Sequence, residues 1–132
     1  MADLFCVPPD EVHQVWPLAR DLIRAAIERT GLSEFEDIER SILAGDQLLW
    51  LAISDHIEAA AATHLTKTKD RPICTLTACS GHDRERWLPL MARIEKYAKD
   101  EGAKCMRIYG RKGWSRVLDG YHVEHVILEK AF

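Results

Sequence analysis

The chain has 132 residues, of which 47% are hydrophobic and 30% are charged, and its 18 basic and 21 acidic residues give a net charge of −3. This is the balance of one globular domain spanning residues 1–132, and it excludes the disordered and collagen-like classes. It supplies no broad positive field for nucleic acid or for an acidic membrane surface. No apolar run approaches the roughly 20 residues of a membrane span, and residues 1–4 lack the basic start and apolar stretch of a signal peptide.

The N-terminal part predicts one strand and two helices. Residues 4–7 form a short apolar strand that ends before two prolines. Apolar residues then recur at three- and four-residue spacing over 12–27, which predicts an amphipathic helix ended by Gly31. Ser33 and Glu36 have the spacing of a capping box and predict the start of a second, shorter helix.

The pattern then changes to the period of a sheet. Residues 47–53 and 57–65 predict two strands joined by a tight turn, and residues 73–79 predict a third strand after a polar loop. A long helix follows over 83–101, and its apolar residues lie on one face. Pro89 is compatible with this helix only if the helix starts late, around residues 85–88, so that the proline lies in its first turn.

The C-terminal part completes the expected fold. It predicts a strand over 105–109, a short helical turn over 113–119 and a last strand over 121–129. The whole order predicts an α/β three-layer domain with a mixed, mainly antiparallel sheet and a C-terminal βαβ unit.

The four cysteines lie far apart in the sequence and show no CxxC spacing. This pattern indicates reduced, mostly buried thiols in a cytoplasmic protein rather than a disulfide framework or a zinc knuckle. Two pairs of residues have marginal metal-ligand spacing, but neither pair brings further ligands, so no metal site is expected.

The order of elements, together with the sequence GRKGWSRVLDGY at residues 110–121, resembles the GNAT superfamily of N-acetyltransferases. The arrangement GR-GW-RVL-GY is similar to that of small phage- and prophage-encoded GNAT-like proteins. The resemblance implies acetyl-CoA or another acyl-CoA as cosubstrate and a small-molecule or protein amine as acceptor. It places the cosubstrate in a gap between the fourth and fifth strands.

The phosphate loop of that superfamily, Arg/Gln-x-x-Gly-x-Gly/Ala, corresponds here to HDRERW at residues 82–87. Glycines in such a loop let backbone amides close on a diphosphate at a helix N-terminus. Here Glu85 and Trp87 stand at the two small positions, so the motif is degenerate. The tyrosine that many members use as general acid corresponds to Arg116.

Cofactor-binding candidates follow the end of the fourth strand into the next helix. These are Ala78, Cys79, Ser80, Gly81, Arg84 and Arg86. Backbone amides at Ser80 and Gly81 favour an anion, and Arg84 and Arg86 add positive charge for the phosphates of CoA. The alternative is an ordinary capped helix start with a solvated, charged first turn.

The catalytic candidates are Glu58, as the base that deprotonates the amine, and Tyr121, as a substitute for the missing tyrosine. Glu58 shares a strand face with His64, and His82 lies in the loop. A structural or solvated role is the alternative for each of them.

A local basic cluster consists of Arg107, Arg111, Lys112 and Arg116, with Trp114 among them. It fits a cosubstrate or an acidic acceptor, or a phosphate patch in which the indole stacks on a base. The negative total charge favours a solvated face instead.

Two functions stay open. The first is an acyl-CoA-dependent N-acyltransferase. The second is a catalytically inactive GNAT-like binding or structural module, such as a phage-derived accessory or virion component. A last strand ending at Phe132 could pair with the edge of a partner chain, which leaves a homodimer, or contacts with other virion proteins, as alternatives.

Overall fold

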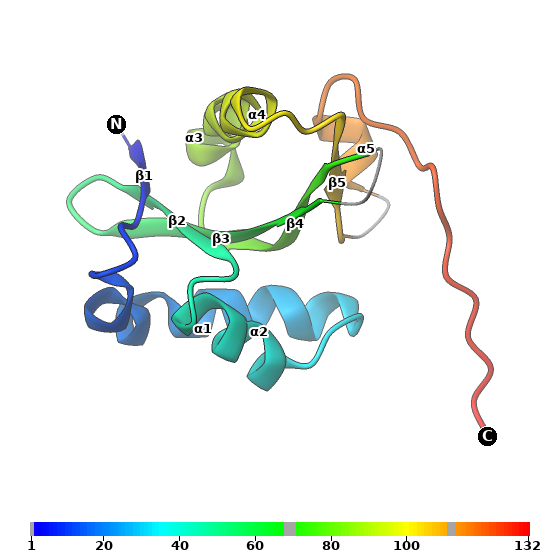
Figure 1. The fold of residues 1–132 in the computed structure, drawn as a ribbon, viewed down its shortest axis with the longest axis horizontal. Helices are drawn as coiled ribbons and strands as arrows, with labels where there is room; N and C mark the ends of the chain where they lie inside the picture. Colours follow the sequence, from blue (N-terminus) through cyan, green and yellow to red (C-terminus); the bar gives the residue numbers. More distant parts are fainter. Residues whose placement is uncertain (1, 68–70, 111–112) are drawn as a thin grey trace.

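The computed structural model describes residues 2–67, 71–110 and 113–132. It shows a five-stranded sheet with helices on both faces (Figure 1). The strands are β1 (Asp3–Cys6), β2 (Leu48–Ile53), β3 (Ile57–Thr66), β4 (Ile73–Gly81) and β5 (Cys105–Ile108). The helices are α1 (Val12–Thr30), α2 (Phe35–Leu43), α3 (Arg84–Trp87), the 3-10 turn η1 (Leu88–Leu90), α4 (Met91–Asp100) and α5 (Trp114–Val117).

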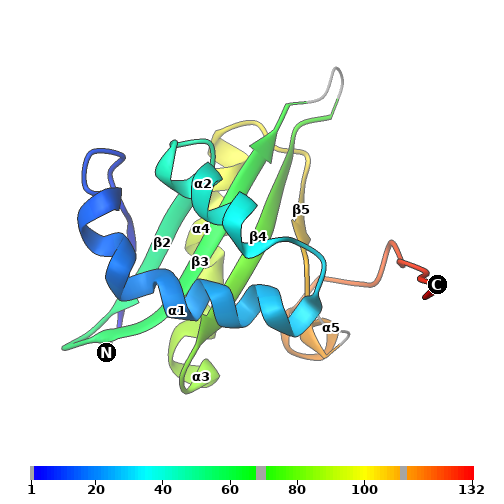
Figure 2. The same cartoon turned by 90° about the horizontal axis from the view of Figure 1, so that it is seen from below.

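The strands follow the order β1-β2-β3-β4-β5 across the sheet. The first three pairings are antiparallel and the last, between β4 and β5, is parallel. The segment α3-η1-α4 makes the crossover between the two parallel strands, on the face opposite α1 and α2 (Figures 1 and 2). The expected α/β architecture, with its mixed, mainly antiparallel sheet and C-terminal βαβ unit, is confirmed.

Helix α1 covers the sheet with the apolar stripe that its spacing predicts. Its buried residues are Val12, Trp16, Ala19, Ile23, Ala26 and Ile27. The helix ends at Gly31, whose backbone adopts the left-handed region at φ 66° while its N–H donates to the carbonyl of Ile27 at 2.9 Å. This stop sets the position of the last turn of α1 beside the end of β4.

The alanine run at the centre of β3 packs under both helical layers. Ala60 and Ala62 face the cluster formed with α1 and α2, whereas Ala61 contacts the opposite cluster that contains Trp50 and Met91. Small side chains on both faces of the strand leave room for helices and large aromatic side chains above and below.

Two helix predictions differ from the structure in detail. The helix expected over 83–101 is divided into α3, η1 and α4, because Pro89 lies in the 3-10 turn, where its ring and missing N–H interrupt a continuous α-helix. The second helix begins at Phe35 with Glu34 at its N-cap and no side-chain capping bond, so the expected capping box is not formed. Neither change moves the strands that flank the crossover.

The last strand expected over 121–129 is wrong. Residues 121–132 have no regular secondary structure and extend away from the domain (Figure 1). A strand requires hydrogen bonds to a neighbouring strand, and β5, the nearest candidate, is paired only to β4 within the described residues. Among those residues, no helix is long and apolar enough to cross a membrane.

Candidate functional site

The candidate site is the point at which β4 and β5 separate. The two strands pair only over the first part of β4, where Ile73 lies opposite Cys105 and Leu76 opposite Ile108. The last backbone bond between them runs from the N–H of Tyr109 to the carbonyl of Leu76 at 3.1 Å. Beyond it, β4 continues to Gly81 in pairing with β3 alone, which leaves a gap along its other edge.

The α1 side of this gap contains a small hollow of about 20 Å³. It is lined by Ala26, Arg29, Thr30, Cys79, Ile108, Tyr109, Gly110 and Trp114. Arg29 donates a hydrogen bond to the buried Ser80 hydroxyl at 2.9 Å, which fixes its guanidinium beside β4. Sequence reasoning missed Arg29. The sequence feature that could have identified Arg29 is its position three residues after the buried Ala26, on the side of α1 that faces the sheet.

A second hollow of about 20 Å³ lies on the other face of the sheet, under α4. Its lining is apolar and includes Trp50, Trp87, Met91 and again Cys79. Burial raises the pKa of the Cys79 thiol to about 12, with the charge of Arg29 acting in the opposite direction. The Cys79 side chain is therefore a neutral thiol between the two hollows and not a nucleophile at neutral pH.

Two indoles stand beside the gap. Trp114 packs against Gly110 so closely that a Cβ on that glycine would lie 2.7 Å from the Cδ1 atom of Trp114. The ring of Trp87 lies 6.2 Å from that of Trp114, measured between centroids. Trp87 is buried, and its Nε1 has no hydrogen-bond partner within the described part of the chain. These rings narrow the space that the strand separation creates.

The end of β4 is bound to β3 rather than left open. Gly81 approaches β3 so closely that a Cβ there would lie 2.5 Å from both the Ala59 Cβ and the Glu58 carbonyl oxygen. The N–H of His82 donates to the same carbonyl at 3.0 Å, and the N–H of Arg86 donates to the Asp83 carbonyl at 2.9 Å. These two amides of the loop are consequently already hydrogen-bonded.

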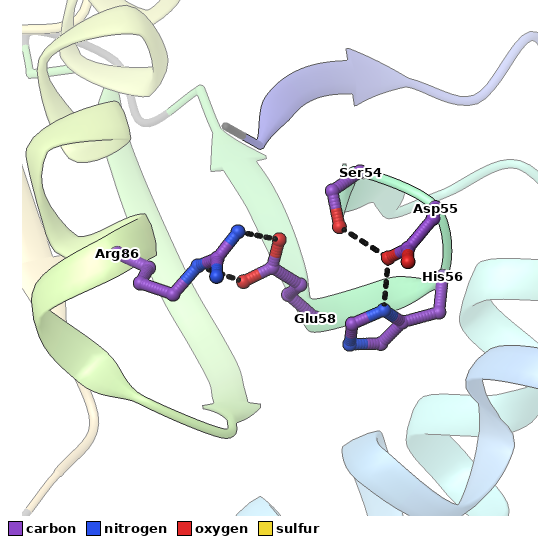
Figure 3. A network of polar contacts seen from close by, with 5 residues as sticks. All are labelled: Ser54, Asp55, His56, Glu58 and Arg86. Atoms are coloured by element: carbon purple, nitrogen blue, oxygen red, sulfur yellow. Dashed lines mark hydrogen bonds and ion pairs between the residues drawn. The ribbon is translucent and has the colours of Figure 1, made fainter.

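Glu58 forms an ion pair with Arg86 of α3 (Figure 3). The Arg86 Nε lies 2.7 Å from one carboxylate oxygen and its terminal nitrogen donates to the other at 3.0 Å. The Ser54 hydroxyl, then the charges of Arg86 and His56, lower the pKa of the Glu58 carboxyl. Two of the predicted site residues thus contact each other. The carboxylate is ionised at neutral pH and is a weak base.

The turn between β2 and β3 places Ser54, Asp55 and His56 side by side at the surface (Figure 3). The Asp55 carboxylate accepts from the Ser54 hydroxyl at 3.0 Å and contacts the His56 Nδ1 at 2.6 Å. These bonds, with that of His56 first, lower the pKa of Asp55. Since the hydroxyl bonds the carboxylate and not the imidazole, this trio lacks the serine–histidine contact that activates a nucleophile.

Tyr121 lies beside α4, where its hydroxyl donates to the Glu95 carboxylate at 2.5 Å. Burial, followed by the Glu95 hydrogen bond and charge, raises the pKa of Tyr121 above its ordinary value. The structure therefore gives Tyr121 and Glu58 separate partners on separate helices.

The remaining predicted residues are distributed around the end of β4. Ala78 is buried in the cluster under α1, and Arg84 is exposed on α3. Of the basic cluster, Arg107 and Arg116 are exposed, whereas Arg111 and Lys112 lie outside the described residues. No group of three or more His, Cys, Asp or Glu side chains in the described ranges could hold a metal ion.

Comparison with known proteins finds similarity in structure alone. No model of a known protein family matches the sequence, and no curated protein does. An aminoglycoside acetyltransferase from an uncultured soil metagenomic sample, solved with sisomicin, superposes with a TM-score of 0.71 at 10% identity, covering 99% of this chain and 95% of that one.

Two further solved structures give the same result. A ribosomal-protein-alanine N-acetyltransferase from Brucella melitensis has a TM-score of 0.68 at 10% identity, covering 100% of this chain and 99% of the other. A GNAT family acetyltransferase from Staphylococcus aureus has a TM-score of 0.66 at 14% identity, covering 99% and 98%. This chain therefore has the GNAT fold.

Proposed function

We propose that this GNAT-fold chain is an acyl-CoA-dependent N-acyltransferase that transfers an acyl group from CoA to an amine. The observation that carries the proposal is the separation of β4 from β5 after Leu76 and Ile108. It leaves the edge of β4 from Thr77 to Gly81 without a β5 partner, so the backbone groups on that edge can bond the amides of a pantetheine arm.

The residues present fit the two parts of an acyl-CoA unequally. The unpaired edge of β4 offers backbone groups to a slim arm and a thioester, and Arg29 supplies a fixed cation at its α1 side. The loop after β4 suits a diphosphate poorly, because Glu85 and Asp83 add negative charge and the His82 amide is already bonded to Glu58. We therefore assign the binding energy to the gap and to the exposed Arg84 rather than to a loop of amides.

The reaction in this proposal joins the amine nitrogen to the thioester carbonyl carbon, breaks the carbon–sulfur bond and moves one proton from nitrogen to the departing sulfur. Backbone N–H groups along β4 would stabilise the charge that develops on the carbonyl oxygen. Glu58 and Tyr121 stay the predicted base and acid. Glu58 can accept the proton only if its ion pair with Arg86 opens, because Arg86 contacts both of its carboxylate oxygens. Tyr121 keeps its proton at neutral pH, as a general acid must.

The acceptor in this proposal is an amine of low positive charge, from a small molecule or a protein. Arg29 lies at the α1 side of the gap, where its charge would repel a polycation. An amine that also carries a carboxylate or a neutral polar group would meet no such repulsion.

A second candidate, a non-catalytic binding module, is favoured by the two indoles. Trp87 and Trp114 lie against each other at the gap, and the hollows beside them hold about 20 Å³ each. A cavity of that size admits about one water molecule and no acyl chain. In this alternative the GNAT fold is kept as a scaffold.

Thermal unfolding at increasing concentrations of acetyl-CoA and of CoA distinguishes the two candidates. If the chain binds either ligand, its thermal midpoint rises with ligand concentration, equivalent to about 2.7 kcal/mol at a hundred times the Kd. Trp114→Ala should tighten binding because it widens the gap, and Leu18→Ala, an exposed change on α1, should leave it unaltered. If neither the native chain nor Trp114→Ala binds either ligand at about millimolar concentration, the transferase proposal is contradicted. The non-catalytic binding module then stands as the better candidate.

A further inference from the structure

The C-terminal segment, residues 121–132, carries large apolar side chains that the described chain does not cover. Val126 is 72% exposed and Leu128 is 91% exposed, and Val123, Ile127 and Phe132 are also open to solvent. Soluble monomers rarely present such a continuous apolar stretch, which is typical of a surface that another segment covers.

The segment has the sequence of a strand that is covered on both faces. Val126, Ile127 and Leu128 are three consecutive apolar residues, a pattern like that of β2, whose residues LLWLAI lie between the two helical layers. A strand of this type belongs inside a three-layer sheet, where helices or loops lie above and below it.

The outer edge of β5 is the position in the sheet that matches this segment. This strand is last in the order β1-β2-β3-β4-β5 and is paired on one side only among the described residues. An open edge presents backbone N–H and C=O groups to any strand of suitable length. The exposed Arg107 of β5 adds a positive charge that complements the carboxylates of Glu124 and Glu129 in the segment. The strand at the other edge, β1, begins with Asp3, whose charge would repel them.

We propose that residues 123–128 pair with β5 of a second copy of this chain, which in turn places its own segment on the first. The segment extends away from its own domain in both views, with Tyr121 at its start held on α4 by Glu95 (Figures 1 and 2). In its own chain His125 reaches Arg107 of β5 at 3.5 Å, a contact between side chains and not a strand pairing. Because one chain carries both the strand and the open edge, the exchange is self-complementary and closes as a two-fold dimer.

Light scattering after size exclusion tests the dimer. We expect the full chain to be dimeric at about 100 µM and the chain ending at residue 122 to be monomeric. Val126→Lys should also give a monomer, because it places a charge inside the joint sheet, and Leu18→Lys, a matched change at an exposed apolar residue of α1, should stay dimeric. A monomeric full chain, or a truncated chain that is still dimeric, would overturn the exchange.

Lysine cross-linking shows which copy receives the segment. Lys104 immediately precedes β5 and Lys130 lies near the end of the segment. In an equal mixture of unlabelled and 15N-labelled chains, equilibrated together, exchange predicts that about half of the Lys104–Lys130 cross-links join one light and one heavy chain. Cross-links found only within chains of one mass would place the segment on its own β5 and refute the proposal. Neither measurement depends on acyl-CoA binding.

Discussion

Arg86 of α3 contacts both carboxylate oxygens of Glu58 on β3, at 2.7 and 3.0 Å, although 28 residues separate the two in sequence. The Glu58 side chain is only 3% exposed, whereas that of Arg86 is 49% exposed. The pair therefore fastens the short helix that follows β4 to β3, the strand that pairs with the end of β4.

Loss of this ion pair should destabilise the protein. We expect Arg86→Ala to lower the thermal midpoint clearly, because it leaves a buried carboxylate without its cation. Arg84→Ala, which removes an exposed arginine from the same helix, is the matched control and should have little effect. Equal thermal midpoints for the two variants at neutral pH would show that the ion pair contributes nothing to the stability of the fold.

The same pair predicts a pH dependence. The pKa of Glu58 in the folded chain lies below its ordinary value of 4.5. The contribution of the ionised Glu58 to the free energy of unfolding is therefore complete above pH 4.5 and disappears as the pH falls through the folded pKa. The difference in midpoint between the native chain and Arg86→Ala should therefore be constant from about pH 6 to 8 and shrink below about pH 4. A difference that grows on acidification would reverse the sign and contradict the assignment.

Gly81 should tolerate no side chain, in contrast to Gly113. A Cβ at Gly81 would lie 2.5 Å from two atoms of β3, so Gly81→Ala should cost about 1–3 kcal/mol in the free energy of unfolding. Gly113 has φ −57°, and a Cβ there would meet no atom within 4 Å, so Gly113→Ala should be neutral or stabilise by up to about 1 kcal/mol. Urea unfolding of both variants measures the difference, and equal effects would refute the close approach.

Replacing Trp87 should lower the free energy of unfolding less than replacing Trp50, because the Trp87 indole N–H makes no hydrogen bond within the described residues. Both side chains are buried, but the Trp50 Nε1 donates to the Thr63 hydroxyl at 2.9 Å, while that of Trp87 has no partner among the described residues. Trp50→Phe loses a hydrogen bond as well as volume, so it should cost about 1 kcal/mol more than Trp87→Phe. Denaturant unfolding of the two variants checks this order, and a larger cost at Trp87 would indicate a hydrogen bond that the structure lacks.

The thiols should differ in reactivity according to burial. Burial raises the pKa of Cys79 to about 12 and that of Cys74 to about 11, so both should react with a thiol reagent at about pH 8 only after unfolding. Cys6 is exposed, so it should react in the folded state although partial burial raises its pKa as well, and Cys6→Ser should remove its share of the reaction and leave that of the half-buried Cys105. Fast modification of Cys79 in the native chain would mean that the gap admits reagents, which would favour the transferase over the module.

Local sequence patterns were sufficient for most elements. The helix with its apolar stripe from Val12 to Ile27 could be predicted from the three- and four-residue spacing of its apolar side chains. Strand β2 could be predicted from its short continuous apolar run. The alternation of these elements then limited the architecture to a three-layer α/β domain, as observed.

The site depended on contacts between residues far apart in the chain. Arg29 and Ser80 are 51 positions apart, and no periodicity links an arginine in the last turn of α1 to a hydroxyl in β4. The pairing of Glu58 with Arg86 was equally invisible, although both residues were candidates, because each was assigned from its own strand or loop.

By itself, therefore, the sequence determined most of the segments that form helices and strands and the class of fold they build, since both follow from short-range periodicity and burial. Only the tertiary structure decided where β5 stops pairing with β4, which charges neutralise one another, and that residues 121–129, a strand by their pattern, have no neighbouring strand within the described chain. A strand exists through hydrogen bonds to another strand, and that partner is fixed by three-dimensional position and not by the segment's own residues.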